Sequence, residues 1–156
     1  MNGVAPDGGM LEHLQAEHHR LNRLLSAIQQ RIHDPAWDSA TSRVPPEFLT
    51  ALHALRAELM AHFAEEGIDG CLGEAAARCP GVVKTLKAIE AEHEVILQAV
   101  NQLIASTTGD AMSAEPLLSR FQTLSEQLHA HEIAETRLLQ HALGSDVTDY
   151  DVEGNE

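Results

Sequence analysis

Hydrophobic residues recur along four stretches of the chain at alternating steps of three and four residues, the spacing of one face of an α-helix. These stretches run from about Met10 to His33, Pro46 to Glu66, Pro80 to Ser106 and Ser113 to Leu143. Segments rich in proline, glycine or aspartate separate them, as is typical of turns and helix ends. We therefore predict an all-α fold, an up-down-up-down four-helix bundle over residues 10–143. Residues 1–9 are expected to be a disordered N-terminus, and residues 144–156 a loosely held acidic tail.

The pattern also repeats within the chain. One constant offset aligns the first stretch with the third, and a slightly shorter constant offset aligns the second with the fourth. The matched polar positions are His18 with His93, His62 with His131, and Glu66 with Glu135. Two helical hairpins with one pattern predict a bundle with internal pseudo-two-fold symmetry.

Each of these six polar residues stands where its helix otherwise carries a hydrophobic residue. In the second and fourth stretches the histidine and the glutamate are four residues apart, so both lie on one helix face, one turn apart. Counted from the helix ends, the four histidines lie at depths that agree to within one turn, at a rise of about 1.5 Å per residue. The four imidazoles are therefore predicted to meet in one layer, with both carboxylates a turn beyond them.

Buried polar groups of this kind need partners. An unpaired buried polar group costs about 1–3 kcal/mol, and an unpaired carboxylate costs more. A metal removes that cost, and two carboxylates shared across the layer are well placed to bridge two cations. Imidazole and carboxylate donors without thiolate favour Fe, Mn or Zn over Cu(I) or an iron–sulfur cluster. The sequence thus predicts a dinuclear metal site, with a purely hydrogen-bonded polar layer as the alternative.

The other histidines and acids lie off the apolar faces of the predicted helices. We expect solvated or helix-flanking positions for His13, His19, His33, His53, His129 and His141. We expect solvated helix faces for Glu17, Glu65, Glu92 and Glu94.

Composition narrows the possible partners and compartments. The formal net charge of −14 argues against nucleic acid and anionic membrane surfaces as partners. No apolar run reaches membrane-spanning length, and Met1–Met10 lacks the features of a secretory signal, so a cytoplasmic location is expected. Cys71 and Cys79 do not form a CxxC motif and are expected to be reduced thiols. With 44% hydrophobic but only 3% aromatic residues, the core is predicted to be aliphatic.

Over about residues 10–143, the ordered set of short motifs resembles the hemerythrin-like (HHE cation-binding) family. The motifs are Glu17-His18, His62-Phe63-Ala64-Glu65-Glu66, Glu92-His93 and His131-Glu132-Ile133-Ala134-Glu135. The resemblance implies two iron ions joined by an oxo or hydroxo bridge, with Zn or Mn as alternatives. It implies His18 and His62 on one iron, His93 and His131 on the other, and Glu66 and Glu135 as bridges.

One position departs from the oxygen-carrying members of that family. They have a fifth histidine one turn before the position of His93, and here that residue is Ile89. The resemblance therefore leaves the second iron short of a ligand. Glu132 is a candidate to fill the gap, and water or an exogenous ligand is the alternative.

Three functions are compatible with these features. The leading hypothesis is a non-catalytic di-iron protein that binds or senses O2, NO or redox state, or holds iron. The second is an oxidase or peroxidase-type enzyme. The only Tyr and Trp, Tyr150 and Trp37, lie outside the predicted helices, which leaves no aromatic redox relay in the core and argues against this enzyme. The third is a metal-stabilised structural bundle whose acidic face engages a protein partner, and the sequence does not identify that partner.

Overall fold

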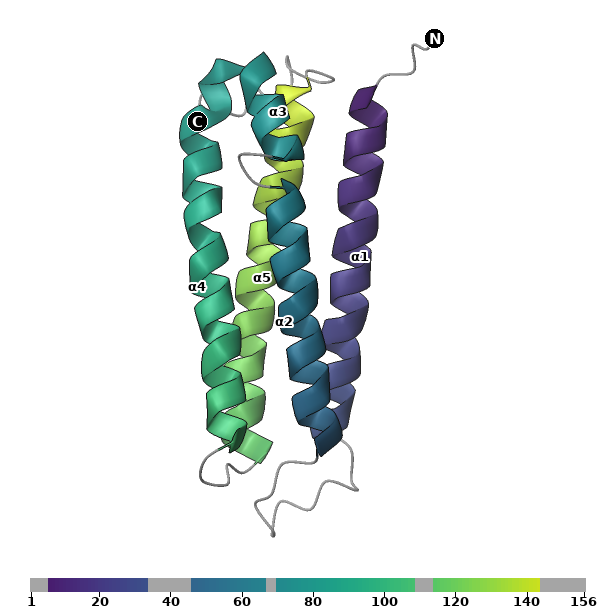
Figure 1. Cartoon of the computed structure of the whole chain (residues 1–156), viewed down its shortest axis with the longest axis vertical. Coiled ribbons are helices and arrows are strands. Elements are labelled where there is room, and N and C mark those ends of the chain that lie inside the picture. Colours follow the sequence, from purple (N-terminus) through teal and green to yellow (C-terminus); the bar gives the residue numbers. More distant parts are fainter. Residues whose placement is uncertain (1–5, 34–45, 67–69, 109–113, 144–156) are drawn as a thin grey trace.

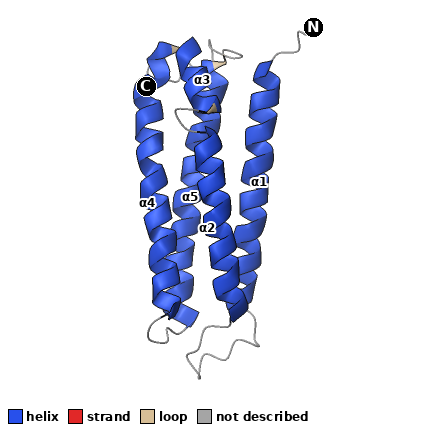
Figure 2. Cartoon of the chain, in the orientation of Figure 1, coloured by secondary structure: helices blue, strands red, loops and turns tan. Residues whose placement is uncertain are grey.

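The computed structural model describes residues 6–33, 46–66, 70–108 and 114–143, and every regular element in those ranges is a helix (Figure 2). The four long helices are α1 (Pro6–His33), α2 (Pro46–Glu66), α4 (Val83–Thr108) and α5 (Ala114–Ala142). They lie side by side (Figure 1), with α1 and α4 each packed against both α2 and α5. The prediction of an all-α fold is confirmed.

The helix boundaries agree with the prediction at most ends, and α1 is the main exception. It begins at Pro6, four residues before the predicted start at Met10. Proline is tolerated in the first turn of a helix, because its fixed φ suits the helix and its missing N–H has no partner there anyway. Residues 6–9 are part of α1, while residues 1–5 and the predicted acidic tail at 144–156 lie outside the described residues.

The connector between α2 and α4 contains a short helix that the sequence did not predict. Helix α3 (Cys71–Arg78) buries the side chains of Leu72, Ala75 and Ala76, and the 3-10 turn η1 (Pro80–Val82) leads from it into α4. A Cβ at Gly70 would overlap the carbonyl oxygen of Glu65, so glycine allows α3 to start directly beside the end of α2. Eight residues are too few for a hydrophobic period to be recognised, which is why α3 was missed.

Buried apolar side chains form two clusters along the helices. The larger cluster includes Leu21, Ile96 and Leu128, and the smaller includes Leu14, Ile89 and Leu138. Because α2 ends at Glu66, the short helix α3 supplies apolar side chains to the smaller cluster in its place. Along α1, α4 and α5 the predicted histidine ligands fall between residues of the two clusters, so a polar layer interrupts the core.

Candidate metal centre

The structure brings the six predicted ligand residues together from all four long helices. All six are at most 9% exposed: His18 on α1, His62 and Glu66 on α2, His93 on α4, and His131 and Glu135 on α5. They form two overlapping groups that share both glutamates, and within each group one ligand atom per residue lies within 4.8 Å of the others.

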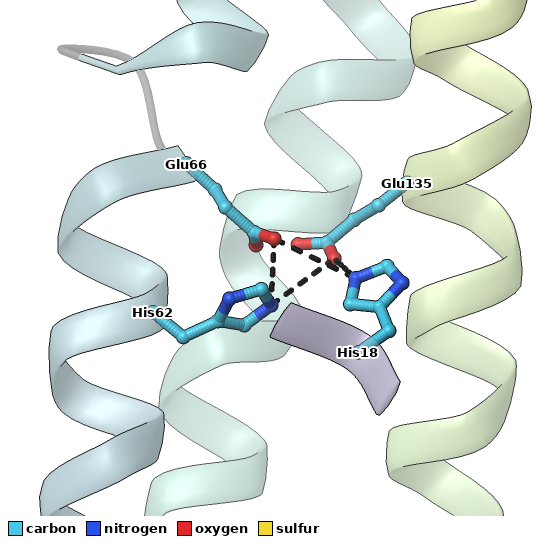
Figure 3. A group of neighbouring side chains, drawn as sticks. All are labelled: His18, His62, Glu66 and Glu135. Carbon is cyan, nitrogen blue, oxygen red and sulfur yellow. Dashed lines mark hydrogen bonds and ion pairs between the residues drawn. The ribbon is translucent and has the colours of Figure 1, made fainter. Parts of the chain in front are cut away.

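The first group contains the imidazoles of His18 and His62, whose ring centroids are 5.2 Å apart. Nε2 of His18 lies 3.0 Å from Oε1 of Glu135 and 3.6 Å from Oε2 of Glu66. Nε2 of His62 lies 2.6 Å from Oε2 of Glu66 and 3.8 Å from Oε1 of Glu135. Figure 3 shows both rings and both carboxylates pointing toward one another from three helices.

The second group contains the imidazoles of His93 and His131, whose ring centroids are 4.8 Å apart. Their Nε2 atoms lie 3.5 Å and 2.7 Å from Oε2 of Glu135. One oxygen of Glu135 therefore faces the first pair of histidines, and its other oxygen faces the second pair. This is the arrangement of a carboxylate that bridges two cations, whereas the closest histidine contacts of Glu66 are with the first pair.

Several potential metal-ligand atoms in this layer are buried without a hydrogen-bond partner among the described residues. They are Nε2 of His62, His93 and His131, both carboxylate oxygens of Glu66, and Oε2 of Glu135. Apart from the contact between Nε2 of His18 and Oε1 of Glu135, the short N···O contacts in the layer thus lack hydrogen-bond geometry. Unsatisfied buried groups cost about 1–3 kcal/mol each, and a cation in each group would satisfy them. These residues can hold metal ions, and their nitrogen and oxygen donors suit Fe, Mn or Zn.

Two outer carboxylates contact the Nδ1 atoms of two of these histidines, on the side of each ring that faces away from the centre. Nδ1 of His62 lies 2.6 Å from Oε1 of Glu17, and Nδ1 of His131 lies 2.7 Å from Oε1 of Glu92. An ionised carboxylate only accepts hydrogen bonds, so Nδ1 carries the proton and Nε2 is left to face the centre. Carboxylate–histidine–metal arrangements of this kind fix ring orientation and raise ligand basicity.

The expectation of a solvated position is therefore wrong for Glu17, whereas Glu92 is exposed as expected but also contacts His131. The side chain of Glu17 is only 13% exposed, and that of Glu92 is 50% exposed. A sequence signal did exist, because the triplets Ala16-Glu17-His18 and Ala91-Glu92-His93 coincide when the first hairpin is aligned with the second.

The charges within the layer perturb one another strongly in the metal-free protein. Burial lowers the pKa of His18 and of His62, but the carboxylates of Glu135 and Glu66 more than offset this and raise these values to about 9 and about 10. Burial raises the pKa of Glu66 to about 7. Burial also acts to raise the pKa of Glu135, yet contacts with the histidines hold it well below its usual range. Protonation of His18 and His62 would thus balance the negative charge of an ionised Glu135.

Glu132 lies elsewhere than the sequence suggested. We expected it beside the second histidine pair, but it belongs to neither group, and its Oε1 accepts a hydrogen bond of 3.2 Å from Nδ2 of Asn22 on α1. Successive residues on a helix are turned by about 100°, so Glu132 points toward α1 while its neighbour His131 points inward. Glu132 is only 4% exposed, and burial raises its pKa. Ile89 is buried in the smaller apolar cluster.

The remaining polar residues mostly follow the expectation. The side chains of His13, His19, His53, His129, Glu65 and Glu94 are exposed. His141 is partly buried, and the side chain of His33 lies outside the described residues. Cys79 is a free thiol, as expected, whereas the side chain of Cys71, like Trp37 and Tyr150, is not described.

Comparison of the chain with protein-family models, curated proteins and solved structures finds no match. Within the described ranges, none of the helices combines the length and the apolar character needed to cross a membrane.

Proposed function

We propose that this chain is a hemerythrin-like, up-down-up-down four-helix bundle that holds a dinuclear non-haem iron centre and uses it to bind or sense O2 or NO. The observation that carries the proposal is the division of the Glu135 carboxylate between two histidine pairs, within a layer of buried donors that have no hydrogen-bond partner among the described residues. The internal repeat supports it further, because each hairpin contributes an equivalent set of two imidazoles and one carboxylate.

The chain's own residues would bind, orient and shield the ions. His18 and His62 would hold one ion, His93 and His131 the other, and Glu135 would bridge them together with Glu66. Glu17 and Glu92 hold the protons on Nδ1 of two of these histidines, which leaves Nε2 free as a ligand. When bound, the two iron ions supply redox chemistry and open coordination positions for a diatomic ligand.

Metal analysis and optical spectra of the protein purified after expression with iron test this proposal. We expect two iron ions per chain and the near-ultraviolet absorption of a bridged ferric pair, which changes on reduction and on exposure to O2 or NO. His62→Ala and Glu135→Ala should lose iron, because each removes a donor of the layer. His53→Ala is the matched control, because this exposed histidine of α2 lies outside both groups and its loss should leave the iron content unchanged.

Two results would count against the proposal in different ways. If His62→Ala and Glu135→Ala both retain two metals per chain, the ligand set is wrong. If the protein binds only zinc and stays colourless after iron reconstitution, the centre is structural and the proposed binding of O2 or NO fails.

A further inference from the structure

The residue after the inward-facing histidine differs between the two repeats. His62 is followed by Phe63 and His131 by Glu132, and these positions coincide when α2 is aligned with α5. Phe63 stacks on the ring of His93, with centroids 4.0 Å apart and planes inclined by 6°. One repeat thus covers a ligand imidazole with an aromatic ring, and the other has a buried carboxylate at the equivalent position.

That carboxylate lies beside a groove between α1 and α5 and contacts two of the residues that line it. The groove has a volume of about 580 Å³, and Asn22, Ser26, Glu126 and His129 are among its lining residues. Oε1 of Glu132 lies 3.2 Å from Nδ2 of Asn22 and 4.0 Å from Nδ1 of His129, so the buried carboxylate contacts both walls. Its Oε2 is buried and has no hydrogen-bond partner among the described residues.

Three potential cation ligands follow one another on α5 from the surface inward. Glu126, His129 and Glu132 are spaced three residues apart, which keeps neighbours on one side of the helix. Glu126 is exposed, the side chain of His129 is 66% exposed, and that of Glu132 is 5% exposed. At the inner end, Glu132 accepts a hydrogen bond from Asn22, which lies one helical turn after His18 on α1.

A second groove, on the other side of α5, is less suited to a cation. Its volume is about 270 Å³, and its lining includes the polar residues Thr85, Arg137 and His141 together with apolar residues such as Val82, Ile133 and Leu138. The fixed positive charge of Arg137 repels a divalent cation, and no carboxylate is among the described residues that line this groove. The chain's net charge of −14 attracts cations generally, so the local difference between the two grooves selects the path.

We propose that the groove between α1 and α5 is the uptake route for divalent metal ions, with Glu126 and His129 as outer sites and Glu132 as the inner site that passes the ion to His18. This inference rests on the metal centre proposed above. In this route Glu132 is a transient contact and not a ligand of the filled centre, which is why it lies outside both ligand groups.

Stopped-flow mixing of the metal-free protein with Co²⁺ tests the route, because bound cobalt absorbs in the visible range. We expect Glu132→Gln to slow uptake about tenfold, the low end of electrostatic effects on association rates, with final cobalt content and spectrum unchanged. Glu12→Gln is the matched control, because it removes one exposed carboxylate of α1 outside the groove and should leave the rate near that of the wild type. Ser26→Trp should also slow uptake, by filling the groove without changing charge.

The outcomes separate the route from the centre itself. Wild-type rates in both Glu132→Gln and Ser26→Trp would overturn the route, even if all proteins bind two cobalt ions. A loss of about half the bound cobalt in Glu132→Gln would make Glu132 a ligand and would also overturn it. If the wild-type protein takes up no cobalt or iron, the proposed function fails and the route fails with it.

Discussion

The hairpin of α1 and α2 and the hairpin of α4 and α5 supply the same ligands but surround them differently. In the first, Glu17 is largely buried behind His62, and in the second, Glu92 is half exposed behind His131. Both oxygens of Glu135 are within 4 Å of histidines of the two pairs, whereas the close histidine contacts of Glu66 are with the first pair alone among the described ion pairs. The two hairpins thus supply the same residue types to the shared layer, but the contacts of these residues and their outer partners differ.

Replacing each of the two layer glutamates by glutamine should give the largest difference between the hairpins. We expect Glu135→Gln to abolish metal binding in both groups, because its oxygens serve both histidine pairs. In the metal-free protein it should also lower the free energy of unfolding by about 3–5 kcal/mol, the cost of removing one partner of a buried ion pair. Glu66→Gln should have a smaller effect and leave weakened binding at the second pair. Metal analysis and urea unfolding measure both, and equal losses in the two variants would contradict the central role of Glu135.

The pH dependence of unfolding in the metal-free protein should show whether protonated histidines balance the charge of the carboxylates when no metal is bound. The folded-state pKa values of His18 and His62, about 9 and about 10, lie above the ordinary value of 6.5. Their protonation therefore stabilises the fold fully below pH 6.5, and this contribution is lost as the pH rises through 9 and 10. We expect the free energy of unfolding to fall by up to roughly 6 kcal/mol between pH 7 and pH 10, because both histidines contribute and one pKa unit corresponds to about 1.4 kcal/mol.

Chemical unfolding of chelator-treated protein measures this fall. The metal-loaded protein serves as the control, because its histidines are already neutral ligands and its stability should change much less over the same range. A metal-free protein that becomes more stable above pH 8 would contradict the assignment of protonated imidazoles.

The outer carboxylates allow a finer comparison of the hairpins. We expect Glu17→Gln to weaken metal affinity about 10- to 100-fold, as is usual when the partner of a ligand histidine is changed. Glu92→Gln should weaken it less, because solvent screens the half-exposed Glu92 in the native protein. Competition with a chelator for Co²⁺ gives both affinities. Equal affinities in the wild type and Glu17→Gln would show that His62 needs no outer partner.

The smallest expected effect concerns the aromatic ring of the first hairpin. Phe63→Leu removes the stacking on His93 while keeping an apolar side chain, and should cost about 1 kcal/mol in the free energy of unfolding. The visible spectrum of the cobalt-loaded protein should shift in band position rather than in stoichiometry. Met60→Leu, an exposed substitution on the same helix, is the control and should change neither.

The histidines and glutamates of the layer could be identified from the sequence because each interrupts an otherwise apolar helix face. The interruptions fall at matching depth in both hairpins, so helix geometry alone predicts that they meet. The same reasoning does not identify the roles of Glu17 and Glu92. Both lie off the apolar helix face, and their roles follow only from the histidines that they contact in the structure. It also leaves Glu132 undecided, since periodicity indicates that a residue faces away from the core but not which helix it meets.

The short helix α3 marks a second limit of prediction from sequence. Its two turns are too short to show a hydrophobic period. Two of its buried residues are alanines, which are equally common in exposed connectors. The structure explains the position of α3: α2 ends at Glu66, and the close approach at Gly70 lets α3 pack over the smaller apolar cluster beyond that end.

The ligands of this layer are far apart in the chain, and His18 and Glu135, which touch through their side chains, are 117 residues apart. No short segment carries a full set, so a metal ion cannot organise the unfolded chain and must wait for the finished bundle. A metal held at the proposed centre would act by mass action on the folded state, adding about 2.7 kcal/mol of stability at a free concentration one hundred times the dissociation constant. Under this proposal the cellular lifetime of the protein would be tied to metal supply, because scarcity would leave more of it unfolded and open to proteolysis.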